Sequence, residues 1–361
     1  MASFPLLFDL GPQKPTTRDV ANTVKAGGTA ALTEAERRAD HARYQEVRCR
    51  SALNRTMGMP FDWTLNPYRG CTHGCHYCYA RRYHSQFEMD SGDEFASVIL
   101  VKINVVDVLR RELARPGWAR EVVALGTATD GYQPIEGHYK LTRRALEVLL
   151  AHRTPVSLIT KGPSVVRDAD VLSQLATIDG SVVYISLSCV DEAICAELEP
   201  GCAPPRQRLR AARQLADAGV RVRILLSPIV PGLSSRPALI ERLIEACGGQ
   251  GLPVVGANVM HLEDGTRTHF FSWLADRHPE LVGGYERLYR GRSSAPAAYR
   301  TEVARAVALA RARHPLPGVA EKHRQTATAS PESAAAVRHI GSTATTPERS
   351  TARNRAASFH C

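Results

Sequence analysis

Three cysteines lie within one short stretch of the sequence, Cys71-Thr-His-Gly-Cys75-His-Tyr-Cys78. Their Cys-x3-Cys-x2-Cys spacing places three thiolates on a single loop. Three thiolates can hold three irons of a [4Fe–4S] cluster and leave the fourth iron open to a substrate or cofactor, whereas an electron-transfer cluster or a structural zinc site needs a fourth protein ligand. The stretch therefore favours a cluster with an open iron, and Tyr77 could pack against an adenine-bearing ligand.

Three other interpretations of this stretch stay open. The chain has 9 cysteines in 361 residues, and an odd number with three crowded into one loop is a poor framework for a disulfide-stapled secreted domain. A zinc site would take His73, His76 or the distant Cys49 as its fourth ligand, although no second cysteine pair follows. A closed cluster would take Cys49 or a thiol of a partner protein.

The composition limits the class of protein. Hydrophobic residues make up 44% of the chain, which is enough for a sizeable core, and the formal net charge is +10, which permits a nucleic-acid partner. No apolar run approaches the roughly 18 residues of a membrane span, and the basic n-region of a signal peptide is lacking at the start. With free thiols, these features predict a cytoplasmic protein that does not bind membranes.

Apolar runs alternate with helical patterns from residue 62 onward. The runs at 63–68, 121–127, 155–161, 181–188, 220–227 and 253–260 are expected strands, and the segments 141–151, 164–176, 206–218 and 236–246 are expected helices. Such alternation predicts right-handed crossovers and a parallel sheet. About six units fit, so the fold class is α/β, a partial (β/α)6 barrel of TIM type. Chemistry in such folds gathers where the strands end.

Four regions follow from this pattern. Residues 1–60 are an expected N-terminal extension, poorly packed apart from a short helix from Thr33, because Thr33-Glu-Ala-Glu36 has capping-box spacing. Residues 61–265 form the barrel, and 266–317 form a C-terminal helical segment. Residues 318–361 are rich in Ala, Thr, Ser and Arg and predict a disordered tail.

Several segments carry a family resemblance in order over roughly residues 61–262. They are Leu65-Asn-Pro-Tyr-Arg-Gly-Cys71 with the cysteine stretch, Gly126-Thr-Ala-Thr-Asp130-Gly-Tyr-Gln-Pro-Ile-Glu136, Leu141-Thr-Arg-Arg, Ile159-Thr-Lys161, Tyr184-Ile-Ser-Leu-Ser188 and Leu225-Leu-Ser-Pro-Ile-Val-Pro-Gly232. Through them the chain resembles radical S-adenosylmethionine (SAM) enzymes, and within these the group related to spore photoproduct lyase, often labelled DNA repair photolyase-like.

The resemblance implies a mechanism. Cys71, Cys75 and Cys78 would hold the [4Fe–4S] cluster, and its open iron would chelate the methionine part of SAM. An electron from a flavodoxin- or ferredoxin-like partner would lead to cleavage of SAM. The resulting 5′-deoxyadenosyl radical would remove a hydrogen atom from the substrate, while the protein orients SAM and excludes water.

Residues at the expected strand ends are candidates for binding SAM. Thr127 and Asp130 could bind the cationic amino group, and Lys161 could meet the carboxylate as a point charge. Ser186 or Ser188 could donate a hydrogen bond to the carboxylate or the ribose. Together with Tyr77 beside the adenine, these residues complete the expected cofactor site.

Two departures from the family pattern limit the resemblance. The lyase uses a cysteine hydrogen-atom donor in its second-strand region, but this chain has no cysteine between Cys78 and Cys189. Reversal of a spore photoproduct by the same relay is therefore not expected. Cys189 could replace the missing donor, but it is expected to be a buried structural residue. Gly131 stands where related segments usually have proline, so we expect a looser turn before Tyr132 and a wider pocket.

The expected function is that of a radical SAM enzyme acting on nucleic acid or another anionic molecule. Arg69, Arg81 and Arg82 flank the cysteine stretch and are placed to meet such a substrate, with pairing to nearby carboxylates as the alternative. The loop 130–136 is expected to face SAM or the substrate, with a plain turn as the alternative. One alternative is a radical SAM enzyme acting on a peptide or small metabolite. Another is a non-enzymatic zinc or iron–sulfur module that binds nucleic acid, which would not need a barrel core.

Overall fold

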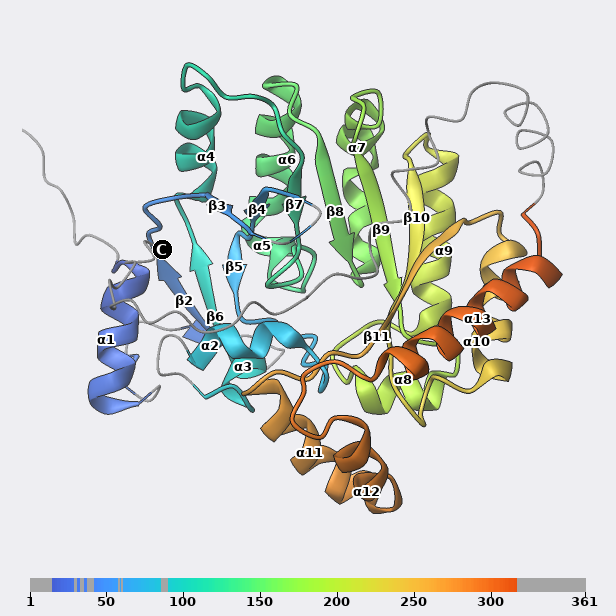
Figure 1. Cartoon of the computed structure of the whole chain (residues 1–361). Helices are drawn as coiled ribbons and strands as arrows, with labels where there is room; N and C mark the ends of the chain where they lie inside the picture. Colours follow the sequence, from blue (N-terminus) through green and yellow to red (C-terminus); the bar gives the residue numbers. More distant parts are fainter. Residues whose placement is uncertain are drawn as a thin grey trace, which may run out of the picture.

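The computed structural model describes residues 15–28, 31–32, 36–37, 42–57, 59, 61–85 and 90–316. In this part of the chain the main sheet has seven strands in the order β11-β10-β9-β8-β7-β4-β3 (Figure 1). They are β3 (Leu53–Arg55), β4 (Trp63–Leu65), β7 (Val123–Leu125), β8 (Val156–Thr160), β9 (Val182–Leu187), β10 (Val222–Ile229) and β11 (Val254–Val259). The strands from β4 to β11 are parallel, and only β3 pairs antiparallel. The predicted partial barrel is confirmed.

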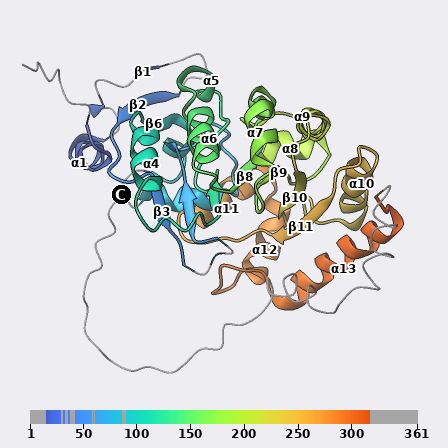
Figure 2. The ribbon, with the colours of Figure 1, turned by 90° about the horizontal axis from the view of Figure 1, so that it is seen from above.

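Helices that connect successive strands cover one face of this sheet (Figure 2). They are α4 (Val105–Leu113), α6 (Leu141–Ala151), α7 (Ala169–Leu175), α9 (Pro205–Asp217) and α10 (Pro237–Gly248), with the 3-10 helix η3 (Pro163–Asp168) before α7 and the short α5 (Glu136–Tyr139) before α6. In α6, Leu141, Ala145 and Leu149 recur at helical spacing and are buried. This spacing explains why α6 has the bounds expected from the sequence.

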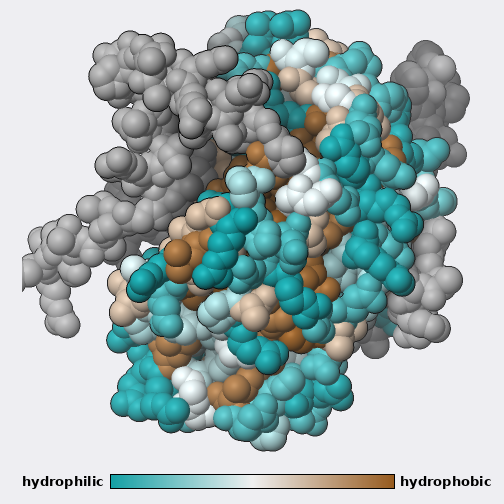
Figure 3. All heavy atoms as spheres, turned by 90° about the vertical axis from the view of Figure 1, so that its right-hand side faces the viewer, coloured by the Kyte–Doolittle hydropathy of each residue, from teal (hydrophilic) through white to brown (hydrophobic). Residues whose placement is uncertain are grey.

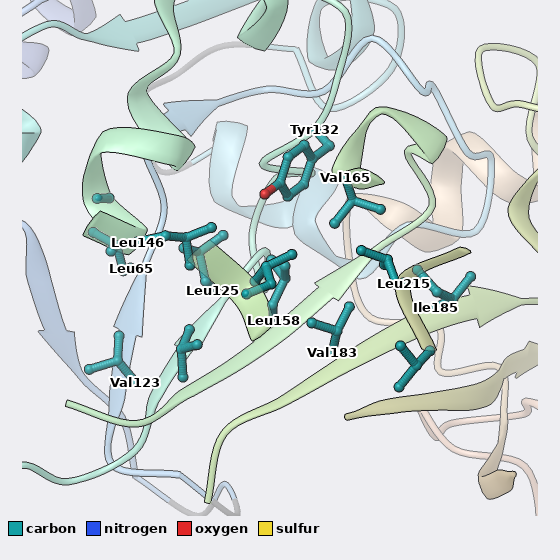
Figure 4. Close-up of a cluster of buried hydrophobic side chains, with 14 of the residues drawn as sticks. Leu65, Val123, Leu125, Tyr132, Leu146, Leu158, Val165, Val183, Ile185 and Leu215 are labelled. Carbon is teal, nitrogen blue, oxygen red and sulfur yellow. The ribbon is translucent and has the colours of Figure 1, made fainter. Parts of the chain in front are cut away.

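The core lies between the sheet and these helices (Figure 4). Side chains of four strands meet side chains of the helical layer, namely Leu65, Leu125, Leu158, Val183 and Ile185 against Leu146, Val165 and Leu215. Each fully buried side chain of this size contributes about 1.5–3 kcal/mol relative to exposure. In β8, alternate residues (Val156, Leu158 and Thr160) are buried, as expected for a strand that turns one face toward the helical layer.

A second sheet, in the order β1-β2-β6-β5, lies beside the first. Its strands are β1 (Glu36–Arg37), β2 (Arg43–Val47), β6 (Val98–Lys102) and β5 (Tyr68–Arg69). Helix α1 (Thr17–Gly27) packs Val20 and Val24 against Val47 of β2 and Val98 of β6. For the described residues of the N-terminal extension, the expectation of poor packing is therefore wrong, because Val20, Val24 and Val47 complete this second core.

The helix expected from Thr33 is not formed where the structure describes it. Residues 33–35 lie outside the described residues, and Glu36–Arg37 form strand β1 instead, because they pair with β2. The expected tail at 318–361 also lies outside the described residues.

The remaining helices lie after the cysteine stretch and at the C-terminal end. They are η2 (Tyr79–Arg81), α2 (Arg82–Ser85), α3 (Glu94–Ser97), α8 (Glu192–Leu198), α11 (Thr266–Arg277), α12 (Pro279–Leu288) and α13 (Ala297–Arg313). Helix α13 buries Val303, Val307 and Ala310 and packs along α10 and β11. The end of the molecule seen in Figure 3 is mainly hydrophilic, with hydrophobic side chains between the polar ones. Among the described helices, none combines the length and apolar character that crossing a membrane requires.

Candidate active site

The three clustered cysteines occupy a loop, residues 71–78, that follows β5 and that we call the cysteine loop. Gly70, directly before it, has φ +80°, and a Cβ at this position would lie 2.6 Å from the carbonyl oxygen of Val98. Glycine is therefore required for the close approach to β6. The approach lets the amide of Cys71 donate a hydrogen bond of 2.9 Å to the carbonyl of Phe95, so the start of the loop is fixed against α3.

Arg81 holds the middle of the cysteine loop from inside the protein. Its side chain is 1% exposed, and its guanidinium donates to the carbonyls of Cys75 (3.0 Å), Gly74 (2.8 Å), Ser91 (3.0 Å) and Gly92 (2.6 Å). The buried guanidinium is thus satisfied by hydrogen bonds to backbone carbonyls, and a buried charged group is stable only with such partners. The expectation that Arg81 meets an anionic substrate is wrong.

The other two arginines near the loop also have protein partners. Arg82 forms an ion pair with Glu263, and Arg69 donates to the carbonyl of Tyr83 at 3.0 Å. Both side chains are partly exposed, so their expected role toward an anionic substrate stays a prediction.

The three thiols differ in their electrostatic surroundings. The sulfur of Cys202 lies 3.7 Å from that of Cys75. The hydrogen bond between these thiols is the main reason why the pKa of Cys75 is lowered to about 6, and the positive charge of Lys161 lowers it further. Burial, followed by the charges of Cys75 and Cys71, raises the pKa of Cys78 to about 12. Thiolates buried side by side repel one another, and bound iron would relieve this repulsion.

The donor set fits a cluster with three protein ligands. Cys71, Cys75 and Cys78 are all free thiols. Among the described residues, no three His, Cys, Asp or Glu side chains are grouped as a single metal ion would need. In a [4Fe–4S] cluster each thiolate instead binds its own iron, so three spaced thiols on one loop suit that group.

The residues considered as a fourth ligand lie in other contacts. His76 is hydrogen-bonded to His269 of α11 at 2.9 Å and stacks on Trp273, and His73 faces Asp130. Cys49 is buried in the core of the main sheet. Cys202, which shows no ligand spacing in the sequence, is the thiol that the structure brings to Cys75.

Asp130 connects the cysteine loop to two strand ends. Its carboxylate accepts hydrogen bonds from the hydroxyl of Thr160 (2.7 Å) and the amides of Lys161 (2.7 Å) and Tyr132 (2.8 Å), and Nδ1 of His73 lies 3.3 Å away. Burial opposes the charged carboxylate, but the charge of His73 and these hydrogen bonds lower the pKa of Asp130 well below its usual range. Asp130 therefore has a structural role here, and its expected contact with the amino group of SAM stays a prediction.

Lys161 and Tyr77 meet beside Cys75. The ammonium of Lys161, at the end of β8, lies 5.7 Å from the ring centre of Tyr77. Burial opposes the charged form, but the charges of Cys75, Glu199 and Cys202 raise the pKa of Lys161. Lys161 is thus a fixed cation next to the candidate cluster, which suits its expected role toward a carboxylate.

A buried ion pair supports Tyr77 from behind. The Tyr77 hydroxyl donates to Glu199, and Glu199 pairs with Arg208. Arg208 also donates to the carbonyls of Ala203 (2.7 Å) and Ser186 (3.3 Å). Glu199 and Arg208 were missed in the sequence. Glu199 lies at the end of α8 and Arg208 lies in α9, and no local pattern links the two positions across the proline-containing loop between them. The expected packing of Tyr77 against adenine stays a prediction.

The other expected SAM contacts lie at successive strand ends. The Thr127 hydroxyl, after β7, accepts from Asn66 at 3.3 Å. On β9, Ser186 donates to the carbonyl of Ser227 at 2.8 Å, and Ser188, just after it, lies 3.8 Å from the sulfur of Cys195. The parallel sheet therefore gathers these residues at one edge, as expected, but no finding tests whether they contact SAM.

In the loop 130–136, Tyr132, Gln133 and Glu136 are buried and form contacts within the protein, and the expectation that the loop faces SAM or the substrate stays a prediction. Tyr132 donates to Asp168 at 2.9 Å, and Glu136 accepts from Tyr68 at 2.5 Å. Gln133 is fully buried and accepts from the amide of Thr72 at 3.1 Å, which gives the cysteine loop another fixed point.

Gly131 does not widen a pocket. A Cβ at this position would lie 2.9 Å from Cδ2 of Leu125 and 3.0 Å from Oγ1 of Thr142, so the glycine permits close packing between the loop and α6. Cys189 is buried, as expected, with its sulfur 2.9 Å from that of Cys195.

Comparisons with known proteins agree with this arrangement. The model of the radical SAM superfamily matches residues 65–244. Uncharacterized proteins of Mycobacterium tuberculosis and Mycobacterium bovis are 38% identical over 285 residues, which cover 77% of this chain and 83% of each relative. An uncharacterized protein of Methanocaldococcus jannaschii is 26% identical over 52% of this chain and 68% of its own length.

Solved structures of spore photoproduct lyase are similar in fold. The lyase complexed with dinucleoside spore photoproduct has a TM-score of 0.59 and 15% identity, and a cysteine-to-serine mutant of the lyase has a TM-score of 0.58 and 16% identity. Each match covers 75% of this chain and 79% of the other. At this identity the similarity concerns the fold alone.

Proposed function

Because this chain belongs to the radical SAM superfamily, we propose that it holds a [4Fe–4S] cluster through Cys71, Cys75 and Cys78 and acts on an anionic substrate, with nucleic acid as the first candidate. The family implies both the cluster and SAM. When bound, these groups supply a 5′-deoxyadenosyl radical that removes a hydrogen atom from the substrate. A flavodoxin- or ferredoxin-like protein is the proposed electron donor.

One observation carries the proposal, namely three free thiols on a loop whose backbone is held by buried side chains. Arg81 binds two carbonyls of the loop, and Gln133 accepts from one of its amides. Ligands held in this way lose little freedom when they bind a cofactor, and this favours binding. Lys161 places a positive charge beside Cys75, where the carboxylate of SAM could bind.

Two features support an anionic substrate. The formal net charge of the chain is +10, which favours association with polyanions. Spore photoproduct lyase, which shares the fold, is known in complex with a dinucleoside photoproduct. The lyase reaction itself is not proposed, because the sequence has no cysteine between Cys78 and Cys189 that could replace the hydrogen-atom donor of the lyase.

The direct test is an anaerobic reconstitution of the full chain followed by iron and sulfide analysis. With dithionite and SAM, we expect 5′-deoxyadenosine, and we expect its formation to change when DNA oligonucleotides are added. Replacing Cys75 by alanine should abolish both cluster and product. The matched controls are Cys49→Ala and Cys247→Ala, which remove buried thiols outside the cysteine loop and should leave the cluster intact.

Each alternative has its own outcome. Tightly bound zinc without iron, and no 5′-deoxyadenosine, would overturn the enzyme proposal. Loss of the cluster in Cys49→Ala would indicate a closed cluster with a fourth protein ligand. If the rate of 5′-deoxyadenosine formation does not change with added DNA or with salt concentration, the substrate is a peptide or small metabolite, because binding to nucleic acid weakens steeply with salt.

A further inference from the structure

A cavity of about 280 Å³ lies at the edge of the main sheet where the strands begin. It is formed by the connections from α4 to β7 and from α6 to β8, which lie at the upper edge in Figure 1, whereas α11 and α12 lie at the lower edge. Its lining includes Arg115, Arg120, Arg153, His152 and Trp118, and we call it the basic cavity. Because parallel strands end at the opposite edge, it is separate from the candidate active site.

The three arginines of the basic cavity are exposed and have no side-chain partner among the described residues. Within the described part of the chain, the side chains of Arg115, Arg120 and Arg153 form neither an ion pair nor a hydrogen bond. Two carboxylates close to these arginines in the sequence bind neutral donors instead: Glu121 accepts from the indole of Trp63 at 2.5 Å, and Glu112 accepts from the amide of Leu53 at 2.8 Å. Three cations therefore share one concave surface and form no ion pair with a carboxylate of the described residues.

The helix C-termini beside the basic cavity offset only part of the positive charge of the three arginines. The cavity lies at the C-terminal ends of α4 and α6, whose C-terminal caps are Ala114 and His152. Each helix C-terminus carries roughly half a negative charge, so two helices offset about one of the three guanidinium charges. The helix termini alone therefore do not neutralise the three guanidinium groups, whose charge suits a phosphate monoester, which carries about −1.5 to −2 at pH 7.

The backbone of the basic cavity is strained at two of these arginines. Among the described residues, positive φ values outside glycine occur at Arg120 (+56°), Arg153 (+49°) and Lys140 (+52°), and the first two line the cavity. Arg153 follows the C-terminal cap of α6, where glycine is the usual residue. Side chains held in this region cost about 1 kcal/mol or more and tend to lie at functional sites.

We propose that the basic cavity binds a phosphate group, carried either by a nucleotide or by a nucleic-acid strand. The phosphate oxygens would accept hydrogen bonds from the planar guanidinium groups, which suit phosphate geometry. Trp118 is fixed by a hydrogen bond to Thr154 at 3.0 Å and by its contact with Trp63, so it forms a rigid apolar wall beside the arginines.

The test uses glycine substitutions, because glycine tolerates the positive φ of both arginines. The cluster-loaded full chain is titrated by calorimetry with inorganic phosphate, a nucleoside monophosphate and a 5′-phosphorylated oligonucleotide. Arg120→Gly and Arg153→Gly should each weaken binding about tenfold or more, since charged hydrogen bonds are lost. The matched control is Lys140→Gly, which removes the same charge at a positive φ outside the cavity and should bind as the native chain does.

The titrated compounds distinguish the two sources of phosphate, a free nucleotide and a nucleic-acid strand. If a strand is bound, the slope of log affinity against log salt should fall by about 0.7–0.9 for each arginine removed. If a free nucleotide is bound, the monophosphate binds and loses affinity in the arginine variants, whereas the oligonucleotide does not bind. Arg153→Lys, which keeps the charge, should retain part of the affinity in either case.

Three results would overturn the proposal. One is the absence of phosphate binding to the native chain at millimolar concentration. Another is an equal loss of affinity in Lys140→Gly and in the two arginine variants. A lower melting temperature without a change in binding would also count against it, because the arginines would then only offset the helix termini. None of these readouts depends on cleavage of SAM.

Discussion

Removal of Arg81 should release the cysteine loop. In Arg81→Met, the carbonyls of Gly74, Ser91 and Gly92 lose their hydrogen-bond donor, whereas the carbonyl of Cys75 keeps the amide of Cys78 at 3.2 Å. At about 1 kcal/mol for each of the three carbonyls left without a donor, the substitution should cost about 3 kcal/mol of the free energy of unfolding. Methionine keeps the apolar contacts of the aliphatic part of the arginine side chain, so the lost unfolding free energy reflects mainly the guanidinium.

Two measurements check this expectation, namely urea unfolding of the chain without cluster and iron retention after reconstitution. The matched control is Arg82→Met at the adjacent position, whose ion pair with Glu263 is partly exposed and should be worth about 1 kcal/mol or less. We expect a lower unfolding midpoint and faster iron loss in Arg81→Met alone. Equal losses in the two variants, or an unchanged cluster in Arg81→Met, would refute the assigned role.

Other substitutions test the contacts around the cysteine loop. Glu199→Gln should cost about 3–5 kcal/mol of unfolding free energy, because it leaves the buried charge of Arg208 uncompensated; a change below about 1 kcal/mol in urea unfolding would contradict this. Gly131→Ala should cost about 1–3 kcal/mol through overpacking, whereas Gly137→Ala, whose Cβ meets no atom within 4 Å, should not destabilise the protein. The lowered pKa of Asp130 means that its carboxylate stabilises the fold at neutral pH. This contribution is lost as the pH falls below the unfolded value of about 3.9 and through the lower folded value, so acid titration from neutral pH should cost the native chain more unfolding free energy than it costs Asp130→Asn.

The sequence was sufficient to predict the elements whose apolar pattern is strong and local. Strand β8 lies within the expected run 155–161, and α6 has the expected bounds. Strand β6 was missed although its five residues are all buried. Strand β6 is as long as β8, but it belongs to the second sheet, whose strands β2, β5 and β6 do not alternate with helices as those of the main sheet do. Periodicity alone therefore did not distinguish its apolar run from a buried helix segment.

Within the candidate site, only the three cysteine ligands could be predicted from the sequence. The spacing of Cys71, Cys75 and Cys78 is a local property and carries the chemistry by itself. The supporting residues are not local, since Gln133 and Glu199 reach the cysteine loop from 61 and 122 residues further along the chain. No pattern in a single sequence reports such contacts, which explains why the sequence did not reveal that Gln133 supports the cysteine loop.

Long-range contacts of this kind make the site a property of the whole sheet. Asp130 connects the ends of β7 and β8 to His73, and Glu199 connects the end of α8 to Tyr77. Each connection buries a charge, and a buried charge is stable only with its partners in place. The cysteine loop therefore reaches its fixed shape only when the strands beside it are paired, and the order of the sheet is what turns three neighbouring thiols into a preorganised ligand set.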